Sequence, residues 1–345
     1  MSIIEQKSSI WHRLYNGETD IRFIGRWKTW FILSGVVLLI GTASLFTNGL
    51  NLGIEFEGGV SWQVPSGHAT VDGMRGAVED AGVKDPTVQT IGSGSNKKLR
   101  IKAELGKVKA ATVRQAIAKE AGTTVNQVDQ QDVSKSWGDQ ITKKARRALL
   151  IFLVLVSLYI AFRFEWKMAL ATLVALVHDI LITVGIYSVF SFEVTPATVI
   201  AILTILGYSI YDGIVVFDRV DENAKVLGKT GSSSYSVMVN RSMNEVLMRS
   251  LNTSITALLP IGSLLFVGSF ILGATSLQEF ALALFIGLLS GAYSSIFIAS
   301  PALALLKERE PRWQALKKRA EGGKGPLVPS GRSAAPKSMV LPEPV

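Results

Sequence analysis

Cysteine is absent from this chain of 345 residues, and histidine occurs only three times. Without thiols the chain has neither disulfides nor cysteine-ligated metal sites. Charged residues make up 18% of the sequence, yet they are nearly missing from several long apolar stretches. A soluble protein distributes its apolar residues in short amphipathic pieces, so these stretches exclude a soluble enzyme.

The apolar residues fall into six blocks that can cross a bilayer. We predict a polytopic α-helical membrane protein with six transmembrane helices at 30–47, 148–162, 166–190, 194–217, 253–271 and 277–305. The first block begins too far into the chain, and is too long, for a cleaved signal peptide. We therefore expect it to remain as the first helix.

The basic residues flank these helices unevenly. The net charge is +9, and Lys and Arg concentrate in 1–29, 218–252 and 306–345, whereas the loops 191–193 and 272–276 contain neither. The positive-inside rule therefore predicts a multi-pass protein of the cytoplasmic membrane with both termini in the cytoplasm. A basic run at 143–147 lies on the other side, but it follows a long domain, where the rule weakens. Because the cations are dispersed along the lipid bilayer, nucleic-acid binding is disfavoured.

Residues 48–147 are predicted to form an extracytoplasmic α+β domain. A strand with a bulge at 53–64 precedes a helix near 70–81, strands near 86–91 and 98–103, a helix near 107–121 and a strand near 124–132. This β-α-β-β-α-β order is the ferredoxin-like pattern. Gly58 and Gly59 are candidate hinge residues where the chain leaves the membrane, with polypeptide contact by Glu55 or Glu57 as an alternative. His68 is the only histidine here, so we expect a binding or lever role without enzymatic activity, cofactor or metal.

The block at 194–217 contains a carboxylate, Asp212, about six residues or roughly 9 Å inside its end. An aspartate in a membrane helix costs about 2.5–3.5 kcal/mol on insertion scales. Such a residue persists when it faces a bundle interior or a wet cavity, where it serves an ion or proton path. The alternative is a structural polar contact between helices.

Three further residues are candidates for proton coupling with Asp212. His178 and Asp179 lie halfway along the block at 166–190 and would titrate if water reached them, although a neutral polar patch remains an alternative. Arg249 is either a counter-ion for Asp212 or one more positive-inside charge. Neighbouring polar residues could support the site: Tyr208, Ser209, Tyr211, Asn252 and Thr253.

The rest of the chain is predicted to be structural. Residues 218–252 form a cytoplasmic loop that contains an amphipathic helix at 237–251 and a turn at 228–236. Pro260 should kink the fifth helix. The small residues of the sixth block, including Ser290, Ser294 and Ser295, are explained by close helix packing. Residues 306–345 form a basic tail that is predicted to be disordered.

Four motifs in order carry a resemblance to a known family. GIEFEGG at 53–59 is similar to the family pattern GIDFxGG, and the pair at 178–179 follows it. GYSIYDGIVVFDRVDEN at 207–223 resembles GYSxNDTVVxFDRxREN, and MRSLNTSITALLP at 248–260 resembles NRTLxTSxTT. The family is SecF, the partner of SecD in bacterial protein export, within the RND (resistance-nodulation-division) superfamily.

The resemblance implies that the chain assists the SecYEG translocon and SecA together with SecD. Such a pair uses the proton-motive force to draw preproteins outward. In this chain a proton from outside would neutralise Asp212, weaken its attraction to Arg249 and let the fourth and fifth helices rock. Tyr211 stands where the family has Asn, Gly213 replaces Thr and Asp221 replaces a basic residue. The Tyr211 hydroxyl could replace the lost amide as a donor to Asp212.

Two other functions remain open. An RND-type exporter of lipids or small molecules would need an apolar cleft in a larger outer domain than about 95 residues supply. A passive scaffold of the translocon would need no ion coupling.

Overall fold

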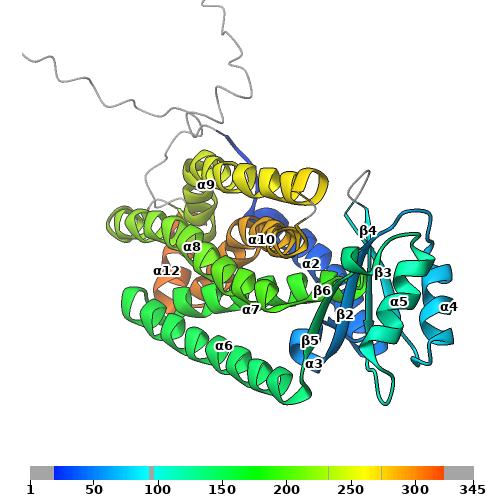
Figure 1. Ribbon diagram of the computed structural model, residues 1–345. Helices are drawn as coiled ribbons and strands as arrows, with labels where there is room; N and C mark the ends of the chain where they lie inside the picture. Colours follow the sequence, from blue (N-terminus) through cyan, green and yellow to red (C-terminus); the bar gives the residue numbers. More distant parts are fainter. Residues whose placement is uncertain (1–18, 93–96, 232, 273, 322–345) are drawn as a thin grey trace, which may run out of the picture.

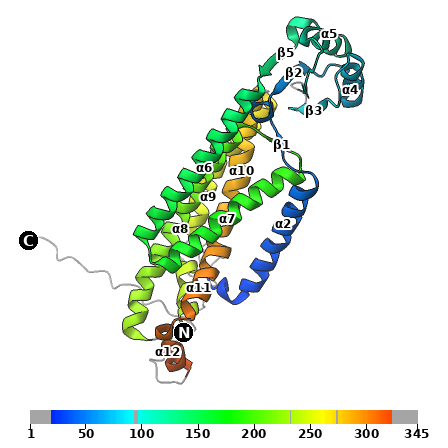
Figure 2. The same cartoon turned by 90° about the horizontal axis from the view of Figure 1, so that it is seen from below.

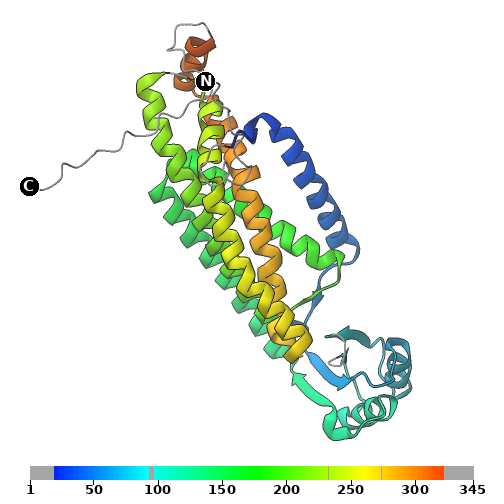
Figure 3. The same ribbon diagram turned by 90° about the horizontal axis from the view of Figure 1, so that it is seen from above.

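The computed structural model describes residues 19–92, 97–231, 233–272 and 274–321. A long helical bundle carries a small α+β domain at one end, and α12 lies at the opposite end (Figures 1, 2 and 3). We call these the domain end and the far end of the bundle. The segments 1–18 and 322–345, which include most of the predicted N-terminal segment and tail, lie outside the described residues.

The bundle consists of long helices joined by short connections. In chain order they are η1 (Ile24–Arg26), α2 (Trp27–Thr47), α6 (Lys135–Arg163), α7 (Trp166–Val189), α8 (Pro196–Thr230), α9 (Tyr235–Phe266), the π-helical η4 (Val267–Leu272), α10 (Thr275–Ser294), the π-helical η5 (Ser295–Ala299), α11 (Ser300–Glu308) and α12 (Pro311–Glu321). Among the described residues, five helices are long and apolar enough to cross a membrane: Ile24–Thr47, Lys135–Arg163, Trp166–Val189, Pro196–Thr230 and Ser276–Glu308. The chain is therefore a multi-pass membrane protein.

Two helices are longer than the sequence predicted. The second predicted helix is only the C-terminal part of α6, which has 29 residues and includes the basic run at 143–147. The predicted loop beginning at 218 is wrong, because α8 continues to Thr230 and ends at Gly231 in a left-handed cap. Ion pairs one turn apart stabilise this polar extension, with Arg219 at 2.6 Å from Glu222.

The predicted boundary between the amphipathic helix and the fifth apolar block is absent from the structure. The amphipathic segment and the fifth apolar block form one continuous helix, α9, that begins after the Ser234 cap and passes through Pro260. The predicted disordered tail is wrong for 311–321, which form α12. The buried Trp313 packs on Tyr235 with ring centroids 4.7 Å apart, so this helix has a specific apolar contact.

The small domain is a four-stranded antiparallel sheet with two helices. Its elements are β2 (Gly59–Pro65), α4 (Val71–Asp80), β3 (Thr87–Ile91), β4 (Lys98–Ala103), α5 (Ala110–Glu120) and β5 (Asp129–Val133), and the strand order is β3-β4-β2-β5. Alternate residues of β2 and β4, such as Trp62 and Ile101, join Met74 and Ile117 from the helices in one buried core. This domain has its own core, separate from that of the bundle.

The GIEFEGG motif is not the predicted strand. Residues Ile54–Glu57 form a helical turn, α3, and Gly58 and Gly59 follow with φ of +82° and +118°. A Cβ on Gly58 would lie 2.8 Å from the Cα of Lys135, and one on Gly138 would lie 2.6 Å from the Phe56 oxygen. The glycines therefore let α3 press against the start of α6.

Two further links join the small domain to the bundle. Strand β1 (Asn51–Leu52) pairs in parallel with β6 (Glu193–Val194), at the start of α8. Arg100 on β4 reaches Glu193 at 2.6 Å and Glu279 on α10 at 2.7 Å, and all three side chains are largely buried. Burial lowers the pKa of Arg100, but the two carboxylates outweigh it and hold the pKa above its ordinary value. We call these three residues the Arg100 cluster.

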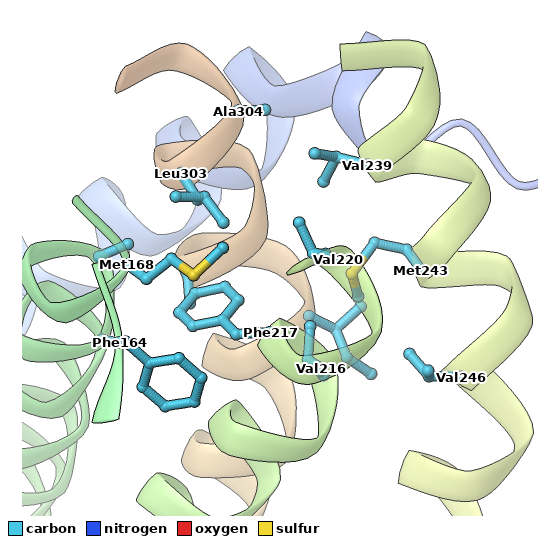
Figure 4. Close-up of a cluster of buried hydrophobic side chains, with 14 of the residues drawn as sticks. Phe164, Met168, Val216, Phe217, Val220, Val239, Met243, Val246, Leu303 and Ala304 are labelled. Carbon is cyan, nitrogen blue, oxygen red and sulfur yellow. The ribbon is translucent and has the colours of Figure 1, made fainter. Parts of the chain in front are cut away.

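The far end of the bundle is closed by an apolar core. Figure 4 shows Val216, Phe217 and Val220 of α8 packed between Met168 and Met243, with Leu303 above them. These side chains come from four different helices, so they fix the spacing of α7, α8, α9 and α11. They lie directly beyond the polar positions of α8 described next.

Candidate functional site

Asp212 lies in α8 within the bundle and is only 3% exposed. Ser250 of α9 donates a hydrogen bond of 2.6 Å to Oδ1, and Ser295 of η5 donates to Oδ2. Asp212 takes part in no ion pair among the described residues. The carboxyl group is thus surrounded by hydroxyls rather than by a compensating cation.

Asp179 forms a second buried carboxyl site on α7. Its Oδ2 accepts hydrogen bonds from Ser209 at 2.7 Å and from Ser294 at 2.8 Å, and its Oδ1 accepts one from Ser290 at 2.9 Å. The Nδ1 atom of His178 lies 3.2 Å from the same Oδ1. Helices α7, α8 and α10 meet at this one side chain, which is 1% exposed.

Glycine lets the helices come close enough for these contacts. A Cβ on Gly291 would lie 3.3 Å from the Cβ of Ser209 and 3.7 Å from Oδ2 of Asp179. Larger side chains at this position would push α10 away from α8, and the serine hydroxyls of α10 would no longer reach the carboxyl group.

A polar cleft of about 440 Å³ lies beside the far end of α8 and α9. Its lining includes Asp218, Arg219, Glu245 and Arg249. Burial raises the pKa of Glu245, but hydrogen bonds from Asn223 and Arg219 outweigh it and hold the pKa below the ordinary 4.5. The cleft therefore presents charged groups within a few residues of the buried Asp212.

Arg249 does not act as the predicted counter-ion in this structure. It is exposed, and within the described part of the chain it forms no ion pair. Its neighbour Ser250 contacts Asp212 instead. Successive residues of a helix point in different directions, so a one-residue offset exchanges a cation for a hydroxyl.

Of the other residues predicted to support the site, only some contact a buried carboxyl group. Ser209 does belong to the site, but it binds Asp179 rather than Asp212. Tyr211 is 56% exposed and points away, so it does not replace the asparagine amide. Asn252 is exposed, and Thr253 donates to the carbonyl groups of its own helix at Arg249 and Ser250. Tyr208 is half-buried.

The hinge candidates lie elsewhere in the molecule. Gly58 and Gly59 join the small domain to α6, and Pro260 is an exposed residue within α9. None of the three contacts either carboxyl group among the described interactions. Their role as structural hinges stays a prediction.

Four serines that donate to the buried carboxyl groups are not among the site residues predicted from the sequence: Ser250, Ser290, Ser294 and Ser295. Helix packing explains Gly291, but the explanation is wrong for Ser290, Ser294 and Ser295, whose hydroxyls bind the two carboxyl groups. A usable signal was present, because Ser290 and Ser294 are four residues apart and share one helix face. Two buried carboxylates on neighbouring helices need such donors.

Both buried carboxyl groups lie in a part of the chain that matches a known protein family. Residues 113–309 match the family described as "Protein export membrane protein SecD/SecF, C-terminal", and residues 43–65 match the "SecD/SecF GG Motif". The SecF subunit of Streptomyces coelicolor is 44% identical over 93% of this chain and 86% of its own length. The chain belongs to the SecF family of protein translocase subunits.

Other family members agree with this assignment. The SecF subunit of Mycobacterium tuberculosis CDC 1551 is 38% identical over 86% of this chain and 69% of its own length. The crystal structure of SecDF from Thermus thermophilus superposes with a TM-score of 0.75 at 32% identity, covering 85% of this chain and 39% of that one. The chain thus spans about two fifths of the fused SecDF protein. As a SecF-family member, it is an accessory subunit of the Sec translocase.

The match to the GG motif coincides with a structural feature described above. Residues 43–65 run from the end of α2 through β1 and α3 into β2, and they include three glycines with positive φ, Gly49, Gly58 and Gly59. In this SecF-family chain the motif therefore forms the passage from the bundle to the small domain.

Proposed function

We propose that this chain works with SecD beside the SecYEG translocon and SecA, and uses the proton-motive force to promote the export of preproteins. The chain then crosses the membrane six times, with residues 253–271 of α9 and η4 as the additional span, and the small domain is a ferredoxin-like domain outside the cytoplasmic membrane. Both termini then lie in the cytoplasm, and the chain itself performs no enzymatic reaction.

The observation that supports proton coupling is the environment of Asp212. A buried carboxylate without a cation costs several kcal/mol, unless hydroxyl groups serve it or it binds a proton. Serine hydroxyls can donate to the charged form and accept from the protonated form. Ser250 and Ser295 therefore let Asp212 exist in both states, and each proton taken up across the field contributes about 2.3 kcal/mol per 100 mV.

The links between the bundle and the small domain supply the lever. Ser295, which contacts Asp212, continues directly from α10, and the domain end of α10 carries Glu279 in the Arg100 cluster. A helix transmits a displacement along its axis because its backbone is stiff. Movement of α10 on protonation would thus reach β4 of the small domain.

Replacing Asp212 with Asn tests this proposal. Inverted membrane vesicles should lose the stimulation of preprotein export by an imposed proton gradient, while export driven by ATP alone continues. The matched control is Asp218→Asn on the same helix, since Asp218 is half-exposed and pairs with Arg163. A full gradient response in the Asp212→Asn vesicles would refute proton coupling and leave a passive scaffold of the translocon.

A further inference from the structure

The two buried carboxyl groups contact consecutive residues of one helix. Ser294 binds Asp179, and Ser295 binds Asp212. These two serines lie where α10 ends and the π-helical η5 begins. Consecutive Cα atoms are about 3.8 Å apart, so neither serine can move far without the other.

Each of these serines has two acceptors for a single proton. Ser294 Oγ lies 2.8 Å from Oδ2 of Asp179 and 3.2 Å from the Gly291 oxygen. Ser295 Oγ lies beside Oδ2 of Asp212 and 3.2 Å from the Ala292 oxygen. A hydroxyl donates only one hydrogen bond at a time, so each serine donates either to a carboxylate or to a backbone carbonyl of its own helix.

The charge of the carboxyl group decides which acceptor the serine hydroxyl binds. A charged carboxylate accepts the serine proton, whereas a protonated carboxyl donates to the serine oxygen and turns the hydroxyl toward the backbone carbonyl. Only the O–H bond of the carboxyl forms or breaks, and its proton comes from water or from the other site. Both serines and both carboxyl groups therefore keep a hydrogen-bond partner in either state.

The backbone at this point can accommodate the change. A π-helical turn leaves carbonyl groups without their usual partner, and such turns are frequent at functional sites. The Ser300 hydroxyl donates to the backbone carbonyl oxygen of Ser295 at 3.1 Å and so gives one of these carbonyl groups a partner. The turn that carries both serines is thus held by side chains as well as by regular helical hydrogen bonds.

We propose that Ser294 and Ser295 are positioning residues that link the protonation of Asp179 to that of Asp212. The proposal rests on proton exchange at Asp212. It adds a second proton-binding carboxyl group and the turn that couples the two.

Few other titratable groups face the pair among the described residues. His178 contacts Asp179 and stacks on Tyr293 of α10 with ring centroids 6.1 Å apart. Tyr208 is the titratable neighbour of Asp212 on α8. Helix α9 offers the Ser250 hydroxyl, and its Arg249 is exposed. Two structural routes therefore connect the carboxyl groups: the serine turn, and α8, which carries Asp212 and also Ser209, a donor to Asp179.

Infrared titration of the purified full chain in lipid nanodiscs tests the link. Buried protonated carboxyl groups give separate C=O bands, which Asp179→Asn and Asp212→Asn assign. We expect the midpoint of the Asp179 band to change by about one pH unit or more when Asp212 becomes Asn. In the Ser294→Ala/Ser295→Ala background, this change should disappear.

The variants keep the rest of each site. Without Ser294, Asp179 retains Ser209 and Ser290, and Ser250 still serves Asp212. The Ser294→Thr/Ser295→Thr variant preserves both hydroxyls and should restore the linkage. The control Ser157→Ala removes a hydroxyl of α6 that donates to its own helix, at Leu153, and should leave the midpoints unchanged.

The outcomes separate this inference from the proposed function. A midpoint change that persists in the double alanine variant shows coupling through the electric field or through Ser209 and α8, and it overturns the role of Ser294 and Ser295. An Asp179 band that never appears while the protein stays folded overturns it as well. Either result can occur while Asp212→Asn still abolishes the gradient response of the vesicles, and proton coupling at Asp212 would then stand.

Discussion

Replacing Arg100 with Met should loosen the docking of the small domain on the bundle. Arg100 is the cation of a buried cluster that joins β4 to Glu193 and to α10 through Glu279. Removing one partner of a buried ion pair costs about 3–5 kcal/mol, because the remaining charge has no compensation. Lys102 lies 3.4 Å from Glu193 and compensates that carboxylate in part, which favours the lower value.

This cost translates into a measurable change of domain position. At about 1.4 kcal/mol for each factor of ten, the ratio of docked to undocked domain should fall about 10²-fold. The pairing of β1 with β6 and the contact of α3 with α6 keep the domain attached. The expected result is therefore a wider range of positions rather than an unfolded domain.

Spin labels can measure this range directly, because the natural chain contains no cysteine. Labels at Asp80→Cys in the domain and Thr204→Cys on α8 occupy exposed positions. Double electron–electron resonance should give a narrow distance distribution in the parent and a broad one in Arg100→Met.

The control applies the same chemical change to an exposed ion pair. Arg75 lies 3.4 Å from Asp72, whose side chain is 93% exposed, and such a pair contributes about 0–1 kcal/mol. Arg75→Met should therefore leave the distribution narrow. If Arg100→Met also leaves it narrow, the cluster does not hold the domain and the lever argument fails.

Three other substitutions have expected outcomes. Gly185→Leu should separate α2 from α7 and destabilise the protein by about 1–3 kcal/mol, because a Cβ at position 185 would lie 2.9 Å from the Cα of Gly41. The efficiency of cross-linking between the two helices measures this separation. Glu245→Gln should lower the melting temperature at neutral pH, and the difference should shrink as pH falls below 4.5, since the lowered pKa of Glu245 contributes stability only while the group is charged. Met74→Ala should destabilise the small domain by about 2–5 kcal/mol, as measured by proteolysis of that domain.

The sequence alone determined the membrane class and the positions of the two buried acids. Long apolar blocks have few alternatives to spanning a bilayer, and a charge inside one of them stands out against its neighbours. Asp179 and Asp212 were found in this way, and both are buried as expected. Strand β4 and helix α4 were also predicted closely, since hydrophobic periodicity is a local property.

Helix ends and the GG motif were harder to predict. The polar end of α8 resembles a loop in composition, but its ion pairs and its packing keep it helical to Thr230. GIEFEGG alternates like a strand, yet α3 forms because α6 offers Gly138 as a surface for it. In both places, contacts between elements outweighed local pattern.

Only the tertiary structure decided which side chains serve each acid. The sequence offered Tyr211 and Arg249 as candidate partners of Asp212, whereas the folded chain supplies Ser250 and Ser295. Ser250 is 38 positions from Asp212 in the chain and Ser295 is 83 positions away, so they become partners only when the helices pack. Which residue of a helix faces Asp212 depends on the rotation of that helix, because successive residues are turned by about 100° about its axis. Helix rotation is set by the apolar core at the far end and by the close glycine contacts, which no local pattern specifies.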